Sequence, residues 1–190
     1  MKKYFILMSL ALVIAGCNEK QNSYRTGDVV FDARGFPYYY GTSVDMAQYK
    51  TLVEGQGWSS EGFEYGVVDN ATGEISTEAA VIPGFSYKFY AEGDVMTEYL
   101  DVSEDLNGTE LAYRTFEYTT ASDGFVRNSR ENGKIEMRVV SLGTDTFDAF
   151  MLTGKHNNGE DCYMLVTFKK MSGKQLQECI DMYKESYYKN

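Results

Sequence analysis

The chain is poor in proline, histidine and positive charge. Only 2 of its 190 residues are proline, which excludes collagen-like and proline-rich low-complexity chains. The single histidine, His156, excludes metal sites built from several imidazoles and leaves little for Ser-His-Asp catalysis. The chain has 18 basic and 28 acidic residues, so its net charge is −10. A negative surface repels phosphates, which argues against a nucleic-acid partner. The composition suits one globular domain with a short appendage.

Sequence motifs for catalysis and for phosphate binding are also missing. Neither a GxGxxG nor a Walker pattern occurs, and there is no GxSxG nucleophile elbow. The segment 103–108 partly resembles a calcium loop, but Arg114 stands where a bidentate Glu is needed. No spacing selects an acid/base pair among the carboxylates, which we interpret as solvent-facing: Glu61, Glu64, Glu98, Asp101, Glu104, Asp105, Glu117, Asp145 and Asp148. We therefore predict that the protein is not an enzyme and has no cofactor and no metal site.

The N-terminus predicts secretion and a lipid anchor. Two lysines precede an apolar run, Tyr4 to Ala15, which is too short to span a bilayer but suits a signal peptide. The sequence Ile14-Ala15-Gly16-Cys17 resembles the bacterial lipobox, which implies that residues 1–16 are removed and that Cys17 is acylated. Acyl chains on Cys17 would hold the protein on a lipid bilayer. By the same resemblance, Asn18 after the cysteine favours the outer membrane, and the side of that membrane stays open.

The remaining chain predicts a mainly β domain flanked by two helices. Residues 17–42 lack periodicity and are expected to form a lipidated tether with an aromatic segment, so that the domain proper is residues 43–190. A helix is expected at 43–54, with Thr42 and Asp45 as a capping box and Gly55 as its end. A last helix is expected to begin at Ser172 with Gln175, and to pack an apolar stripe outside the sheet or across one end of it.

Between the helices, a two-residue period alternates with hairpin-turn signals. Phe85–Phe89 and Ile135–Val139 alternate apolar and polar residues, and Asn-Gly or Asp-Gly pairs follow at 107, 123 and 132. The spacing of roughly 8 to 15 residues leaves no room for helices between strands. We therefore predict a meander of about eight or nine antiparallel strands that closes into an up-and-down barrel, since closure removes the sheet edges.

Short segments of this meander resemble a known family. The run Leu52-Val53-Glu54-Gly55-Gln56-Gly57-Trp58 leads a helix into a first strand, an aromatic strand ends near Gly93, and the last strand closes with Phe168-Lys169-Lys170. Over about residues 50–171 the chain resembles a lipocalin-like domain of small bacterial envelope lipoproteins. The resemblance implies a barrel and a membrane anchor rather than an activity.

The aromatic fraction of 15% suggests what the barrel does. Eight strands leave an interior that either is filled by side chains or holds one small ligand. The expected interior residues, and the candidate ligand contacts, are Trp58, Phe85, Tyr87, Phe89, Tyr113, Ile135, Met137 and Val139. The first hypothesis is a binder of a small apolar or amphipathic ligand. The second is a filled barrel that acts as an interaction module for an envelope protein.

Two further residue groups carry open alternatives. Tyr38, Tyr39 and Tyr40 either cover the barrel or present an exposed aromatic patch to a partner. Cys162 and Cys179 either form a disulfide, which an oxidising compartment permits, or stay as two buried thiols. Neither cysteine has neighbours at metal-ligand spacing.

Overall fold

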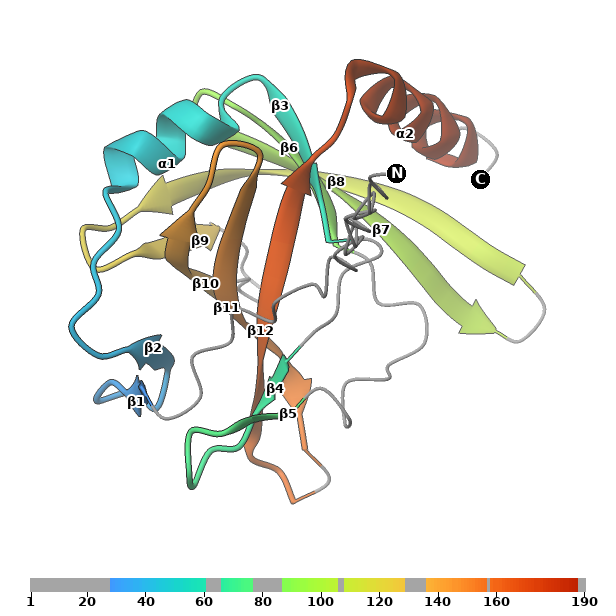
Figure 1. Ribbon diagram of the computed structural model, residues 1–190. Helices are drawn as coiled ribbons and strands as arrows, with labels where there is room; N and C mark the ends of the chain where they lie inside the picture. Colours follow the sequence, from blue (N-terminus) through green and yellow to red (C-terminus); the bar gives the residue numbers. More distant parts are fainter. Residues whose placement is uncertain are drawn as a thin grey trace, which may run out of the picture.

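The computed structural model describes residues 28–60, 66–76, 87–105, 108–128, 136–156 and 158–187, with the backbone alone at 100–105, 108–112, 128 and 184–187. Cys17, Phe85 and Ile135 therefore lie outside the described residues or side chains. In the described part of the chain, eight antiparallel strands form a closed barrel. Two short two-stranded elements and two helices lie around this barrel (Figure 1). This arrangement confirms the predicted up-and-down barrel with an N-terminal and a C-terminal helix.

The barrel strands follow one another around the barrel in chain order. They are β3 (Gln56–Ser59), β6 (Lys88–Glu92), β7 (Val95–Asp105), β8 (Gly108–Thr120), β9 (Phe125–Asn128), β10 (Glu136–Leu142), β11 (Thr146–Lys155) and β12 (Asp161–Lys170). The last strand closes the ring by pairing with the first, as Lys170 lies opposite Trp58. Because every consecutive pair is antiparallel, short turns suffice between most of the strands.

One end of the barrel is closed by helix α1 (Met46–Val53). Its N-cap is Asp45, whose carboxylate accepts the backbone N–H of Ala47 at 2.9 Å. The predicted start at residue 43 was wrong, because the Thr42 hydroxyl instead donates to the carbonyl of Tyr39. Gly55 ends the helix with a φ of 64°, as predicted.

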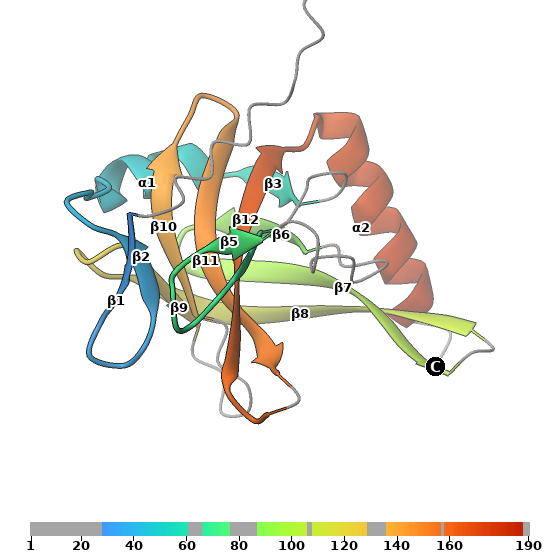
Figure 2. The ribbon, with the colours of Figure 1, turned by 60° about the horizontal axis from the view of Figure 1, so that its bottom comes forward.

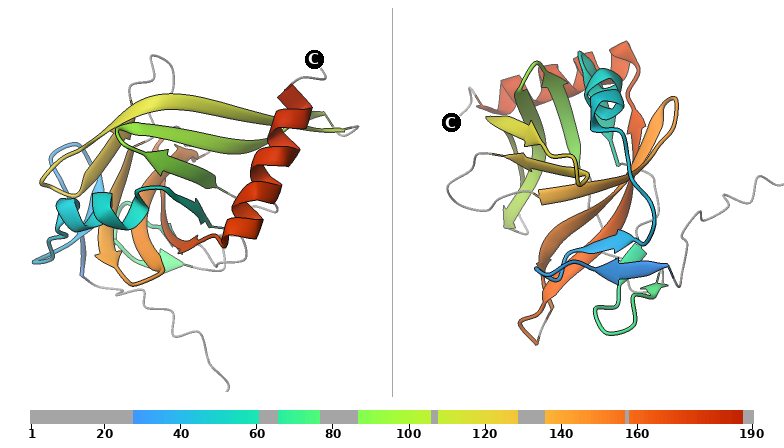
Figure 3. Two further views of the ribbon diagram at one scale, coloured as in Figure 1. Left: turned by 90° about the horizontal axis from the view of Figure 1, so that it is seen from above. Right: turned by 90° about the vertical axis from the view of Figure 1, so that its left-hand side faces the viewer.

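Helix α2 (Gly173–Tyr187) packs on the outside of the barrel. The predicted capping box is present, since the backbone N–H of Ser172 donates to Gln175 Oε1 and the N–H of Gln175 donates to Ser172 Oγ. Cys179 and Tyr183 are buried against Tyr99 of β7. Seen from above, α2 crosses the outer face of the β6–β8 part of the wall, away from α1 (Figure 3, left).

A second outer layer covers the other side of the barrel. The ribbon of β1 (Val29–Phe31) and β2 (Pro37–Tyr39) and the hairpin of β4 (Gly66–Val68) and β5 (Ile75–Ser76) pack against outward-facing side chains of β9, β11 and β12. Figure 2 shows β1 and β2 on the side of the barrel opposite α2. The β1–β2 ribbon and β9 were not predicted, because both are too short to show a period.

Neither helix has the length and apolar character that crossing a bilayer requires, and the described residues contain no other helix.

Candidate functional site

The barrel interior collects five of the eight predicted interior residues. Trp58, Tyr87, Phe89, Met137 and Val139 belong to one buried cluster together with Met46, Tyr49 and Val53 of α1. They come from β3, from β10, and from β6 with the residue just before it. The register places inward-facing residues side by side, as in the pairs Trp58–Phe89 and Met137–Met151. Phe85 and Ile135 are outside the described residues.

Tyr113 does not lie in the barrel interior. It pairs with Tyr99 on β7 and packs, half-buried, in the outer cluster under α2. Side chains alternate between the two faces of a strand, and Phe116, three residues further along β8, is the one that points inward. The prediction for Tyr113 was therefore wrong about the face of β8 on which this residue lies.

Aromatic rings fill the interior below α1. Phe147 of β11 lies at the centre, with its ring centroid 5.4 Å from Tyr49, 5.0 Å from Trp58 and 4.7 Å from Phe168. Phe89 also packs against Phe168, at 5.7 Å. These edge-on and stacked contacts make the α1 end a packed aromatic core.

Among the described residues, two polar atoms of this aromatic core have no hydrogen-bond partner. They are the hydroxyl of Tyr49 and the indole Nε1 of Trp58, both on fully buried side chains. Burial, reinforced by the nearby Tyr118, raises the pKa of Tyr49 well above its ordinary value. The hydroxyl therefore stays protonated, and the core holds two donors that a polar acceptor would satisfy.

Glu98 is a buried carboxylate inside the barrel. It was expected to face solvent, but it is 0% exposed and pairs with Phe89 on the inward face of the sheet. The hydroxyl of Tyr87 donates to Glu98 Oε1. Tyr87 is itself fixed by Ser60, whose Oγ accepts the Tyr87 backbone N–H at 2.8 Å. The composition of β7 could not reveal this site, because the inward side of the strand depends on register.

Exposure changes along β8 next to this carboxylate. Arg114 on β8 lies opposite Glu98 in the strand register and is exposed, whereas Phe116, two residues nearer to α1, is buried. The interior therefore changes along its axis from packed rings under α1 to the buried polar pair of Tyr87 and Glu98. A ligand pocket needs this combination of an apolar wall and a few convergent polar groups.

The three tyrosines of the aromatic segment mostly cover the barrel. Tyr39 is buried, with its ring 5.3 Å from Phe150, and Tyr38 is half-buried against the guanidinium of Arg138 at 4.2 Å. Tyr40 is 74% exposed. Of the two alternatives, the structure supports the cover rather than a contiguous exposed patch.

Cys162 and Cys179 are not joined by a disulfide. Cys162 lies at the start of β12, opposite Gly154, and the strand then runs away from it for about 26 Å before α2 begins, at roughly 3.3 Å per residue. Cys179 is buried with Tyr99 and Tyr183. The described residues contain no group of His, Cys, Asp and Glu side chains suited to hold a metal ion.

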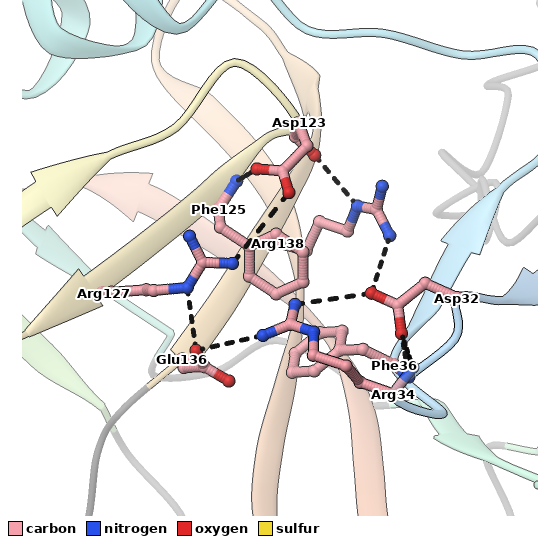
Figure 4. Close-up of polar contacts among 8 residues, drawn as sticks. All are labelled: Asp32, Arg34, Phe36, Asp123, Phe125, Arg127, Glu136 and Arg138. Atoms are coloured by element: carbon pink, nitrogen blue, oxygen red, sulfur yellow. Dashed lines mark hydrogen bonds and ion pairs between the residues drawn. The ribbon is translucent and has the colours of Figure 1, made fainter.

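Outside the barrel, three arginines surround the ring of Phe125, and we call them the arginine cluster (Figure 4). The guanidinium carbons of Arg34, Arg127 and Arg138 lie 4.4, 4.3 and 5.0 Å from the ring centroid. Asp32, Asp123 and Glu136 interleave with them, so the cluster is neutral overall. It links the β1–β2 ribbon to β9 and β10. The sequence showed only that charged and apolar residues alternate along β10.

Comparison with known proteins finds no matching family model and no matching curated protein. Among solved structures, bovine odorant binding protein complexed with its natural ligand has a TM-score of 0.39 and 14% sequence identity, covering 70% of this chain and 82% of that chain. The complex of bovine odorant binding protein with undecanal has a TM-score of 0.37 and 15% identity, covering 70% and 81%. The function is therefore argued from the residues of this chain.

Proposed function

We propose that the protein is a membrane-anchored lipoprotein whose barrel binds one small amphipathic ligand. The observation that carries this proposal is the pair of Glu98 and Tyr87, a polar group buried in a mainly apolar interior. A carboxylate in such a place binds a hydrogen-bond donor, such as an amine or hydroxyl, while Phe89 and Met137 contact the apolar body of the ligand.

The alternative of a filled interaction module is less favoured. That hypothesis expected a contiguous aromatic patch around Tyr38–Tyr40, and two of these three rings are instead turned onto the barrel. A filled interior also does not explain why residue 98 is a glutamate. An apolar residue would pack at this position without the free-energy cost of burying a carboxylate.

The proposed anchor is the acylated Cys17, supported by the lipobox-like sequence before it. The ribbon that packs on the barrel begins at residue 28, so roughly eleven residues connect Cys17 to the folded domain. Fully extended, this connection spans at most about 38 Å. The barrel would then stay close to the membrane, and outer-membrane placement remains part of this proposal.

The test is native mass spectrometry of the full mature protein, released from detergent after incubation with an extract of its source cell. We expect an added small mass on the wild type that is lost in Glu98→Gln, because the amide does not attract a cationic or donor group as a carboxylate does. Tyr40→Phe, a change at an exposed ring, should retain the mass. A bare protein mass with all extracts would refute ligand binding in the barrel.

A further inference from the structure

A small pocket lies outside the barrel, beside the arginine cluster. Its volume is about 100 Å³, the space of roughly three water molecules. It is lined by four segments: Tyr38 of the ribbon, the loop Thr42–Val44, the turn Ser122–Gly124 and Arg138–Val140 of β10. The pocket is thus built where the ribbon, the approach to α1 and the barrel wall meet.

Arg138 in this pocket has hydrogen-bonding capacity to spare. A guanidinium has five N–H donors. Within the described residues the Arg138 side chain makes one hydrogen bond, from Nε to the carbonyl of Asp123 at 3.1 Å. Its Nη1 is buried and lies 3.8 Å from Asp32 Oδ2, without a hydrogen bond. Unused donors on a buried cation usually indicate a missing acceptor.

The positive charge of Arg138 is also weakly compensated. The Arg138 side chain is only 14% exposed, and its desolvation lowers its pKa. The charges of Asp32 and Asp123 raise this pKa, but they offset only part of the lowering. Asp32 accepts the backbone N–H groups of Arg34 and Phe36, each at 2.9 Å, and also pairs with the Arg34 guanidinium. Arg138 is therefore the member of the cluster whose charge has the least direct partner.

The other two arginines differ from Arg138 in this respect. Arg127 donates to Glu136 at 2.8 Å, and Arg34 reaches both Asp32 and Glu136 at 3.4 Å (Figure 4). Tyr38 lies face-on to the Arg138 guanidinium at 4.2 Å and fixes its plane. A guanidinium fixed in this way presents a planar fork, which matches a carboxylate better than a tetrahedral anion.

We propose that this pocket binds the carboxylate of a small organic acid, independently of any ligand in the barrel. The carboxylate pairs with Arg138, and Ser43 and Ser122 line the same pocket. A second, open hollow of about 480 Å³ beside α1 shares Val44 and Ser122 with the pocket. This hollow gives room for an alkyl chain attached to the carboxylate.

The test is a titration of the full, ¹⁵N-labelled protein with butyrate, followed by NMR. We expect saturable shifts of the Gly124 amide and of the Arg138 Nε–H. Butyramide, which has the same shape without the charge, should produce none. Arg138→Gln should weaken butyrate binding about tenfold or more, since hydrogen bonds to charged groups are lost. Lys174→Gln removes one exposed positive charge from α2, on the side of the barrel opposite the ribbon, and should leave binding unchanged.

A second variant separates loss of binding from loss of folding. Ser43 is exposed and lies outside α1, so Ser43→Phe obstructs the pocket without removing Arg138, and it should weaken butyrate binding while the rest of the spectrum stays native. Equal butyrate shifts in wild type and Arg138→Gln would overturn the proposal. Inorganic phosphate binding as tightly as butyrate would overturn the assignment to a carboxylate.

Discussion

Single residues decide the polar chemistry of the barrel interior, and Glu98 is the clearest case. A buried carboxylate costs free energy unless hydrogen bonds compensate for the lost water. The hydroxyl of Tyr87 supplies one such bond, and Ser60 holds the Tyr87 backbone in place. The tyrosine therefore stabilises the fold through its hydroxyl as well as through its ring.

Tyr87→Phe keeps the ring and removes this donor. We expect the free energy of unfolding to fall by about 1–3 kcal/mol, the cost of leaving a buried acidic group with one bond fewer. Chemical denaturation measures the loss. The matched control is Tyr40→Phe, the same change at a ring that is 74% exposed, which should alter stability by less than about 0.5 kcal/mol. Equal effects of the two variants would contradict a stabilising role for the Tyr87 hydroxyl.

Asp32 gives a residue-scale prediction that depends on pH. Burial by itself raises the pKa of Asp32, but the N–H groups of Phe36 and Arg34 and the Arg34 charge outweigh it and lower the pKa below its ordinary value. A lowered carboxyl pKa contributes stability above the unfolded-state pKa, about 3.9, and this contribution is lost as pH falls through the folded-state pKa.

Asp32→Asn should therefore destabilise the protein by about 1 kcal/mol at pH 7 and by progressively less below pH about 4. Urea denaturation at a series of pH values measures the difference from wild type. Asp145→Asn, in the exposed β10–β11 turn, serves as the control for general charge effects. A difference that stays constant down to pH 2.5 would show that the Asp32 charge has no part in holding the ribbon.

At the scale of elements, the outer layer is held by close backbone approach as well as by charges. Gly73, in the β4–β5 turn, has a φ of 72°, and a Cβ built there would lie 2.8 Å from the carbonyl oxygen of Val29 in β1. The hairpin and the ribbon can meet only because this residue is glycine.

Gly73→Ala should lower the free energy of unfolding by about 1–3 kcal/mol more than Gly159→Ala does. Gly159 is the matched control, because its φ of 88° imposes similar backbone strain while a Cβ there meets nothing within 4 Å. Thermal denaturation of both variants measures the difference. Equal losses would mean that the hairpin shifts freely away from β1.

The elements also show what the sequence could predict. A strand with a clear period, such as β10, and the capping box at Ser172 depend on local patterns and were predicted correctly. The burial of Glu98 and the outward direction of Tyr113 depend on which alternate residues of β7 and β8 face the barrel interior, and this is set by the pairing of the strands. The arginine cluster depends on the ribbon reaching β9 and β10, which no local pattern in residues 28–42 specifies.

At the scale of the whole molecule, the proposed lipid anchor and the folded barrel are separate parts of the chain. Cys17 lies before the first described residue, so its substitution should affect attachment without affecting the barrel. A lipid anchor adds binding energy of about 0.8 kcal/mol per buried CH₂ group, and its loss should release the protein.

Cys17→Ser should move the protein from the membrane fraction to the soluble fraction and abolish incorporation of labelled palmitate. Its thermal unfolding in detergent should match that of wild type. Cys162→Ser, at a half-buried thiol in the barrel wall, is the control and should keep both the label and the membrane attachment. Palmitate incorporation that persists in Cys17→Ser would disprove the proposed anchor.

The pairing of β12 with both β3 and β11 has a kinetic consequence. The ring closes through contacts between Trp58 and Lys170, which come from opposite ends of the barrel sequence, so the loop that must be ordered is long and closure is slow. A chain whose synthesis has not reached β12, or one truncated before Asp161, leaves the edges of both β3 and β11 unpaired. Completion of the last strand is thus the event that separates an aggregation-prone intermediate from a finished protein.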